Sequence, residues 1–126
     1  MSVSAQQQQY YQEMRIQTAD RKELLLLVYE AALRALHRAR RACKTGAESK
    51  ARGELMTAMA AVHELNRTLN MEAGAIAESL RSLYVYVLRM IADAAPDLKA
   101  EPLDEAIRII GSLYETWQEA FAKMVE

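Results

Sequence analysis

Apolar and small residues recur along this chain at intervals of alternately four and three residues, in four separate stretches. That interval places side chains on one face of an α-helix, because the helix turns once every 3.6 residues. No stretch alternates apolar and polar residues as a half-buried strand would. The pattern therefore predicts four amphipathic helices. Their apolar faces comprise Leu25, Tyr29, Ala32, Leu36, Ala39 and Cys43; then Leu55, Met59, Val62, Asn66 and Leu69; then Ile76, Leu80, Leu83, Val87, Met90 and Ala94; and finally Leu103, Ile107, Ile110, Tyr114, Trp117, Phe121 and Met124.

Capping and helix-breaking residues separate the four stretches. Asp20, followed three residues later by Glu23, has the spacing of a capping box and predicts the start of the first helix. Pro96 and Pro102 predict the end of the third helix and the start of the fourth, because proline disfavours helical geometry in the preceding residue and suits a first turn. The predicted helices span residues 20–45, 47–69, 73–95 and 102–124, with Gly46 and Asn70 in the first two links. Four such helices with short links predict an all-α fold, an antiparallel four-helix bundle.

One polar residue interrupts the apolar face of the second helix. Asn66 stands where an apolar side chain would continue the pattern. We expect its amide to form buried hydrogen bonds that fix the register of the helices, at some cost in stability.

The overall composition does not point to a particular class of partner. The 16 Lys and Arg residues nearly balance the 17 Asp and Glu residues, so neither nucleic acid nor an anionic membrane is indicated. The balance hides an asymmetry, since residues 1–53 carry ten basic and five acidic residues and residues 54–126 carry six and twelve. Cys43 is the only cysteine, which rules out an internal disulfide and favours a reducing compartment. No apolar run reaches the roughly 18 residues of a membrane span, so we expect a cytoplasmic protein without membrane insertion.

The sequence contains no motif for catalysis or metal binding. A di-metal bundle needs Glu-x-x-His on facing helices, and the carboxylates nearest His63, Glu64 and Glu54, do not have that spacing. Cys43 falls on the apolar face of the first helix, where a small buried thiol is the favoured interpretation. No glycine-rich phosphate loop or Ser/His/Asp set is present. We therefore predict no enzymatic activity, no metal and no cofactor.

His63 nevertheless keeps an alternative function open. Histidine phosphotransfer domains are four-helix bundles of similar length with one exposed histidine on a helix. His63 lies on a shoulder of the second apolar face, where it could be exposed. That family usually has lysine three residues and glycine four residues after the histidine, and here Asn66 and Arg67 occupy those positions. A histidine that packs its ring and solvates one nitrogen is the favoured interpretation.

The basic run HRARRACK, residues 37–44, raises the possibility of a nucleic-acid site. Arg34, Arg38 and Arg41 share one helical face. No aromatic residues interleave with them, and basic residues near the end of a helix are favoured by its dipole. A solvated basic face is the favoured interpretation.

Among the apolar residues outside the predicted core faces, six form additional stripes. They are Leu24 and Leu27 in the first helix, Val85 and Leu88 in the third, and Ile109 and Leu113 in the fourth. Wide helical faces would bury some of them, but Leu27 and Val85 point nearly opposite the core. Extra apolar stripes on several long helices predict grooves that another polypeptide fills.

Residues 1–19 are predicted to form an N-terminal arm, separate from a bundle domain of residues 20–126. The stretch QQQQYYQEMRI places glutamines, which favour water, next to apolar side chains. We expect the arm to lie weakly over a groove when the groove is empty, so that a better ligand displaces it. The anchors of this arm are Tyr10, Tyr11, Met14 and Ile16.

In these features the chain resembles the FliS family, cytosolic export chaperones for flagellin, over nearly its whole length. YQEMRIQTAD is similar to the family's arm, with a tyrosine, a spaced apolar residue and Thr-Ala before the first helix. ELLLLVYEAAL resembles its leucine-rich opening, ELNRTLNMEAG the turn after its second helix, and SLYVYVLRMI its Leu-Tyr-x-Tyr stretch. The matching positions include Tyr11, Ile16, Thr18, Ala19, Tyr29, Glu30 and the late tryptophan, Trp117.

Four positions depart from the family's pattern. Arg21 stands where the family often has proline, and Ala31 where glycine is common. Val85 replaces a frequent aspartate, and Met90 replaces one of a usual pair of arginines. The changes in the third helix make its surface more apolar, which affects the details of partner binding rather than the class of partner.

The resemblance implies a chaperone that binds the disordered C-terminal segment of flagellin, prevents its premature polymerisation and assists its delivery to the flagellar export apparatus. A component of the export gate is implied as a second partner, and the arm covers part of the cargo groove in free family members. No nucleotide and no nucleic acid is implied, and we expect a monomer or a weak homodimer. The predicted cargo-groove residues are Leu24, Leu27, Tyr84, Val85, Leu88, Ile109 and Leu113.

Overall fold

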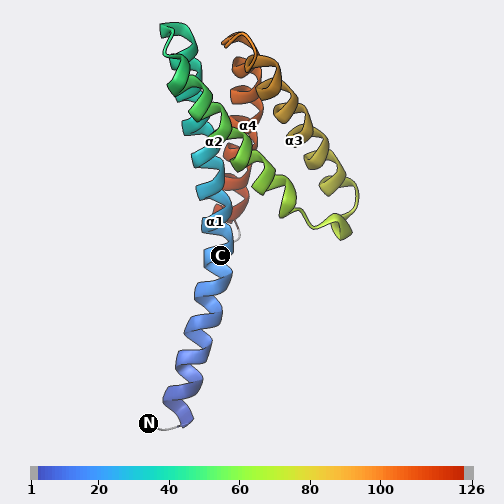
Figure 1. The fold of residues 1–126 in the computed structure, drawn as a ribbon. Coiled ribbons are helices and arrows are strands. Elements are labelled where there is room, and N and C mark those ends of the chain that lie inside the picture. The colour runs from blue at the N-terminus through green and yellow to red at the C-terminus, as the bar shows by residue number, and fades with distance from the viewer. Residues whose placement is uncertain (1–2, 124–126) are drawn as a thin grey trace.

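The computed structural model describes the backbone of residues 3–123 and the side chains of residues 21–123. These residues form four α-helices and one short 3-10 helix, and the predicted all-α four-helix fold is confirmed (Figure 1). The elements are α1 (Val3–Thr45), α2 (Glu48–Arg67), the 3-10 helix η1 (Met71–Ala73), α3 (Ala75–Ala94) and α4 (Glu101–Lys123).

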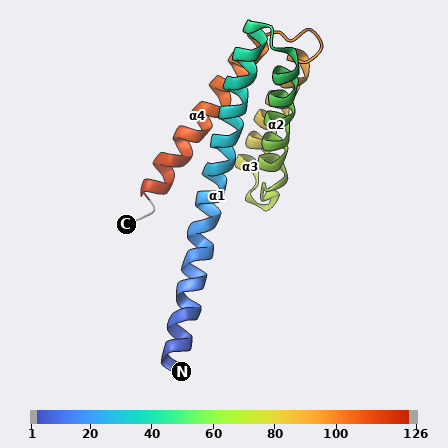
Figure 2. The same ribbon diagram turned by 60° about the vertical axis from the view of Figure 1, so that its left-hand side comes forward.

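The helices form a ring in which each packs against two neighbours. α1 packs against α2 and α4, and α3 packs against α2 and α4, so α1 and α3 lie diagonally across the bundle. Successive helices run antiparallel, which places the α1–α2 and α3–α4 links at one end and the α2–α3 link at the other (Figure 1). Toward the second end the helices diverge, and Figure 2 shows the last turns of α4 leaving α1.

The start of the first helix differs from the prediction. α1 begins at Val3 and passes through Asp20 without a break, so Asp20 is not its N-cap. The physical reason is that residues 3–45 contain neither glycine nor proline, while glutamine, glutamate, methionine and alanine all favour a helix. The first part of α1 projects beyond the other three helices (Figure 1). Tyr10, Tyr11, Met14 and Ile16 lie outside the residues whose side chains are described, so their contacts with a groove stay a prediction.

The predicted core faces of the first, second and fourth helices are largely correct. Fully buried residues include Leu36, Val62 and Ile110, each from one of those faces. Alanines accompany them, and their small side chains allow α1 and α2 to approach closely. The buried alanines of these two helices are Ala32, Ala35, Ala39, Ala42, Ala51 and Ala58.

The predicted core face of the third helix is correct only in part. Val87 and Ala94 are buried as predicted, but Ile76 is 62% exposed, and Ala77, Tyr84 and Ile91 are buried in addition. This helix is apolar on most sides, so two neighbouring stripes satisfy a helical period equally well. Packing against the other helices selects the stripe that contains Tyr84, whose hydroxyl has a hydrogen-bonding partner in the core.

Side chains connect the helices at the narrow end of the bundle, which carries the α1–α2 and α3–α4 links. Arg52 on α2 donates from Nη1 to the carbonyl oxygen of Ala95, after the end of α3, over 3.1 Å. Arg40 on α1 forms an ion pair with Asp104 in the first turn of α4. Toward the opposite, wide end, where the helices diverge, aromatic side chains fill the space between them. The ring centroids of Tyr29 and Tyr114 lie 6.3 Å apart there.

Candidate functional site

A hydrogen-bonded aromatic cluster occupies the centre of the wide half of the bundle. The hydroxyl of Tyr29 on α1 is hydrogen-bonded to that of Tyr84 on α3. Trp117 on α4 donates its Nε1–H to the oxygen of Tyr29 over 3.0 Å. Burial raises the pKa of both phenols above the ordinary tyrosine value, and the bond to Tyr84 raises that of Tyr29 further. Both phenols are therefore neutral at physiological pH.

The placement of Tyr84 corrects one predicted groove residue. Tyr84 is 1% exposed, so its side chain belongs to the core and does not face a groove. Its buried hydroxyl is tolerated because Tyr29 provides a partner. The neighbouring tyrosine in the sequence pattern, Tyr86, is the one that faces outward.

A groove runs between α3 and α4, with a volume of about 400 Å³. Ile109 forms its floor and is nearly buried, while Leu113 is half-buried. Leu83 and Tyr86 of α3 form the opposite wall and are 37% and 40% exposed. The structure thus brings the predicted residues Ile109 and Leu113 together with two residues that the sequence analysis did not assign to a groove.

The polar rim of the α3–α4 groove comes from α4. Arg108 donates from Nε to Oε2 of Glu105 over 3.0 Å, and this hydrogen bond lowers the pKa of the Glu105 carboxyl. Ser112 completes the rim one turn later. An apolar floor with a charged rim suits an amphipathic segment that buries one side and keeps the other in water.

The outer face of α3 continues this groove. Tyr86 also borders a shallow depression of about 320 Å³ with Val85, Arg81 and Arg89. Val85 is 41% exposed, in agreement with its predicted position away from the core. Leu88 is half-buried and packs against the core, so it contributes less surface than predicted.

A second and larger groove of about 550 Å³ lies between α1 and α2. Leu24, Leu25 and Val28 line it from α1, and Leu65 lines it from α2. Arg21, Glu64 and Thr68 form its rim. Leu24 therefore lines a groove, on a different side of the bundle from Ile109 and Leu113, and its contact with cargo stays a prediction. Leu27 is exposed but lines neither groove.

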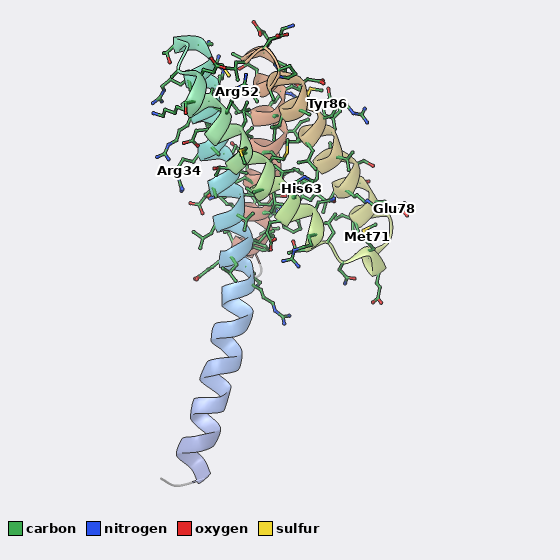
Figure 3. The ribbon with its side chains drawn as sticks, in the orientation of Figure 1. Arg34, Arg52, His63, Met71, Glu78 and Tyr86 are labelled. Atoms are coloured by element: carbon green, nitrogen blue, oxygen red, sulfur yellow. The ribbon has the colours of Figure 1, made fainter. Side chains whose placement is uncertain are left out.

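Three polar or reactive residues have simpler roles than a chemical site. His63 is exposed on α2 beside the Glu64–Arg67 ion pair (Figure 3). Burial raises the pKa of the Cys43 thiol, which favours its protonated form. The buried Oδ1 of Asn66 has no hydrogen-bonding partner among the described residues, so the predicted buried hydrogen bonds of this amide are not seen at that atom.

The described chain offers no metal centre and no membrane span. Within it, no group of three or more histidine, cysteine, aspartate or glutamate side chains could hold a metal ion. Among residues 3–123, every helix is too short or too polar to cross a bilayer. The two apolar grooves remain the candidate site.

Comparison with known families adds one finding that covers almost the whole chain. The model of a family described as "Flagellar protein FliS" matches residues 3–124. No individual curated protein matches the chain. The matched range includes both grooves, the aromatic cluster and the projecting part of α1.

Proposed function

The chain belongs to the FliS family of flagellar export chaperones, and on that basis we propose that it binds the disordered C-terminal segment of flagellin in its two grooves. The observation that supports this function best is the α3–α4 groove, where Leu83 and Tyr86 stand exposed above Ile109 and Leu113. Exposed apolar side chains gathered beside a concave surface mark an interaction site rather than a folding core. The phosphotransfer alternative through His63 finds no support in a match to a chaperone family.

The energetics require several anchor points. Burying one leucine-sized side chain contributes about 1.5–3 kcal/mol, whereas ordering a disordered segment costs about 2–5 kcal/mol or more. Two or three anchors in a single groove contribute about 3–9 kcal/mol, which at the lower end does not exceed that cost. Because the α1–α2 and α3–α4 grooves lie on different sides of the bundle, a segment that uses both must wrap around it.

We propose that residues 1–19 cover a groove when flagellin is absent. The α1–α2 groove begins at Arg21, immediately after this segment, and is lined by Leu24, Leu25 and Val28. To reach it, the chain must leave its helical path near Asp20 and fold back. Tyr10, Tyr11, Met14 and Ile16 would then fill the groove until flagellin displaces them.

The chaperone acts in the cytoplasm in this proposal, and it has two consequences for flagellin. Sequestering the C-terminal segment keeps subunits from polymerising before export. Handing the bound subunit to a component of the export gate requires a surface outside the grooves. The near balance of charge and the absence of any catalytic set in the sequence agree with a binding protein rather than an enzyme.

Titration calorimetry with a synthetic flagellin C-terminal segment at two temperatures tests this function. We expect one-to-one binding with a negative heat-capacity change, because apolar surface becomes buried. Tyr86→Ala should weaken binding, since Tyr86 borders both the groove and the α3 depression. Met56→Ala is the matched control, because Met56 is 74% exposed but lines neither groove. Absence of heat at both temperatures, or equal losses in both variants, would contradict the proposal.

A further inference from the structure

The outward side of α1 carries a row of four side chains, one leucine followed by three arginines. Leu27, Arg34, Arg38 and Arg41 follow one another at intervals of seven, four and three residues, which places them on one helical face. All four are exposed. We call this set the α1 stripe. At 1.5 Å per residue it extends over about 21 Å.

Arginines without an ion pair are not confined to the stripe, since Arg21, Arg81 and Arg89 also have none among the described residues, but only the stripe aligns three of them in one row. Arg40, Arg52, Arg67 and Arg108 are each paired with a carboxylate of the same chain. Within the described residues, no such ion pair involves the three arginines of the stripe. Glu30 lies one turn before Arg34 but forms no ion pair with it; burial and the nearby charge of Glu30 raise the pKa of Tyr114 on α4.

The position of the stripe on the helix requires a further explanation. The helix dipole favours basic residues only in the last turn of a helix. Arg41 stands near the end of α1 at Thr45, but Arg34 precedes that end by about three turns. Like charges spaced four residues apart destabilise a helix. A row of three unpaired guanidinium groups is therefore suited to a ligand that supplies the missing negative charge.

The chemistry of the stripe favours an acidic protein segment over a nucleic acid. Leu27 is 57% exposed and continues the row of arginines, so it adds an apolar contact that a phosphate backbone does not use. No aromatic side chain stands between the arginines to stack on bases. We propose that the α1 stripe docks an amphipathic helix of another protein, with carboxylates facing Arg34, Arg38 and Arg41 and an apolar residue against Leu27.

The stripe is separate from the α3–α4 groove. α1 and α3 lie diagonally across the ring of helices, and Figure 3 shows Arg34 and Tyr86 on opposite sides of the bundle. A partner on the stripe therefore leaves that groove open. The inference goes beyond flagellin binding and does not depend on it.

Fluorescence anisotropy with a labelled synthetic peptide tests this docking site. The probe is a 21-residue helical peptide with glutamates at intervals of four and three residues and one leucine on the same face. The comparison peptide has the same composition with its glutamates distributed around the helix. We expect the first peptide to bind at least tenfold more tightly than the second, and less tightly as salt rises from 50 to 300 mM.

Two charge-matched double variants locate the site. R34E/R38E should weaken binding of the probe at least tenfold, whereas R81E/R89E, with the same change in net charge on α3, should change it less than twofold. Circular dichroism checks folding, and R34Q/R38Q replaces R34E/R38E if the latter does not fold. Equal losses in the two pairs, or equal binding of the two peptides, would overturn the proposal.

Two further measurements separate this site from other interpretations. Tighter binding of a 20-base-pair DNA duplex than of the peptide at the same salt concentration would overturn the proposal in favour of a nucleic-acid site. Calorimetry of R34E/R38E with the flagellin segment should show unchanged affinity. If the flagellin segment binds to neither wild type nor variant, the proposed function fails while the result for the stripe stands.

Discussion

The phenol of Tyr29 on α1 is hydrogen-bonded to the phenol of Tyr84 on α3, across the centre of the bundle. The described parts of these two helices do not otherwise pack against each other, because they occupy opposite corners of the ring. Trp117 of α4 donates to the same Tyr29 oxygen. Three helices thus meet at one hydroxyl group.

Tyr84→Phe removes one hydroxyl and keeps the ring. We expect the free energy of unfolding to fall by about 0.5–1.5 kcal/mol, the usual net contribution of one hydrogen bond. Tyr84→Ala also leaves a cavity and should cost about 3–5 kcal/mol. Urea denaturation followed by circular dichroism measures both changes. Equal losses in the two variants would show that the ring contributes nothing beyond its hydroxyl.

The same phenols predict a loss of stability in alkali. Their pKa values are raised in the folded protein by burial, and in the unfolded chain tyrosines titrate near pH 10. The unfolded state therefore binds fewer protons above that pH, and stability falls as pH rises further. Denaturation midpoints between pH 8 and 11 test this. The slope should be shallower in Y29F/Y84F and unaltered in the exposed-residue control Tyr86→Phe.

The core face of α3 can be tested with one chemical change at two positions. Ile91→Ala should cost about 2–5 kcal/mol, because Ile91 is fully buried. Ile76→Ala should change stability by less than about 0.5 kcal/mol, because Ile76 is exposed. Chemical denaturation compares the two variants. The reverse order would restore the core face predicted from the sequence.

A charge introduced at an exposed apolar position separates the two interaction surfaces. Val85→Lys should leave the thermal midpoint nearly unchanged and reduce affinity for the flagellin segment at least tenfold, because the complex would bury an ammonium group beside Arg81 and Arg89. Leu27→Lys should leave that affinity within twofold, because Leu27 lines neither groove. Calorimetry decides between them. Equal losses in affinity would extend the flagellin site along α1.

Deletion of residues 1–17 tests the proposed groove cover. If the arm competes with flagellin, its loss should raise affinity by up to about 1–3 kcal/mol, or about 5–150-fold. Y11S/I16S should reproduce most of this gain, because those side chains are the proposed anchors. Calorimetry and binding of an apolar dye to the free protein measure the two effects. A loss of affinity would instead indicate an arm that closes over bound flagellin.

The sequence predicted the links between the helices well, because glycine and asparagine residues mark where the helices end. Gly46 and Gly74 both have positive φ angles at links between helices, and the Asn70 side chain accepts a hydrogen bond from the backbone N–H of Glu72 at 3.1 Å. Periodicity alone placed one or more core residues correctly on each predicted face, including Leu36, Val62, Val87 and Ile110. These features are local, and local sequence determines them.

The remaining features depend on packing between helices. Periodicity could not choose between the Ile76 and Ala77 stripes of α3, because both are apolar. It therefore assigned Leu83 to the core and missed its place in the α3–α4 groove with Tyr86. The capping-box pattern at Asp20 and Glu23 predicted a helix start that the structure does not have. The prediction failed because the pattern Asp-x-x-Glu also occurs inside helices. No residue before it interrupts the backbone hydrogen bonds of α1.

The unbroken course of α1 gives residues 3–20 a second possible role. As a helix they form a rod that reaches about 27 Å ahead of Arg21, and in that form they cannot fold back into the α1–α2 groove. The covered groove and the extended rod are mutually exclusive states of one segment. The balance between these two states is a helix–coil equilibrium. Residue 21 stands where the helix would have to break, so its helix propensity affects this equilibrium. The proline often found there in the family would favour the break, whereas arginine in this chain favours the rod. If residues 1–19 cover the groove as proposed, a helix–coil equilibrium in this segment controls the access of flagellin to the groove.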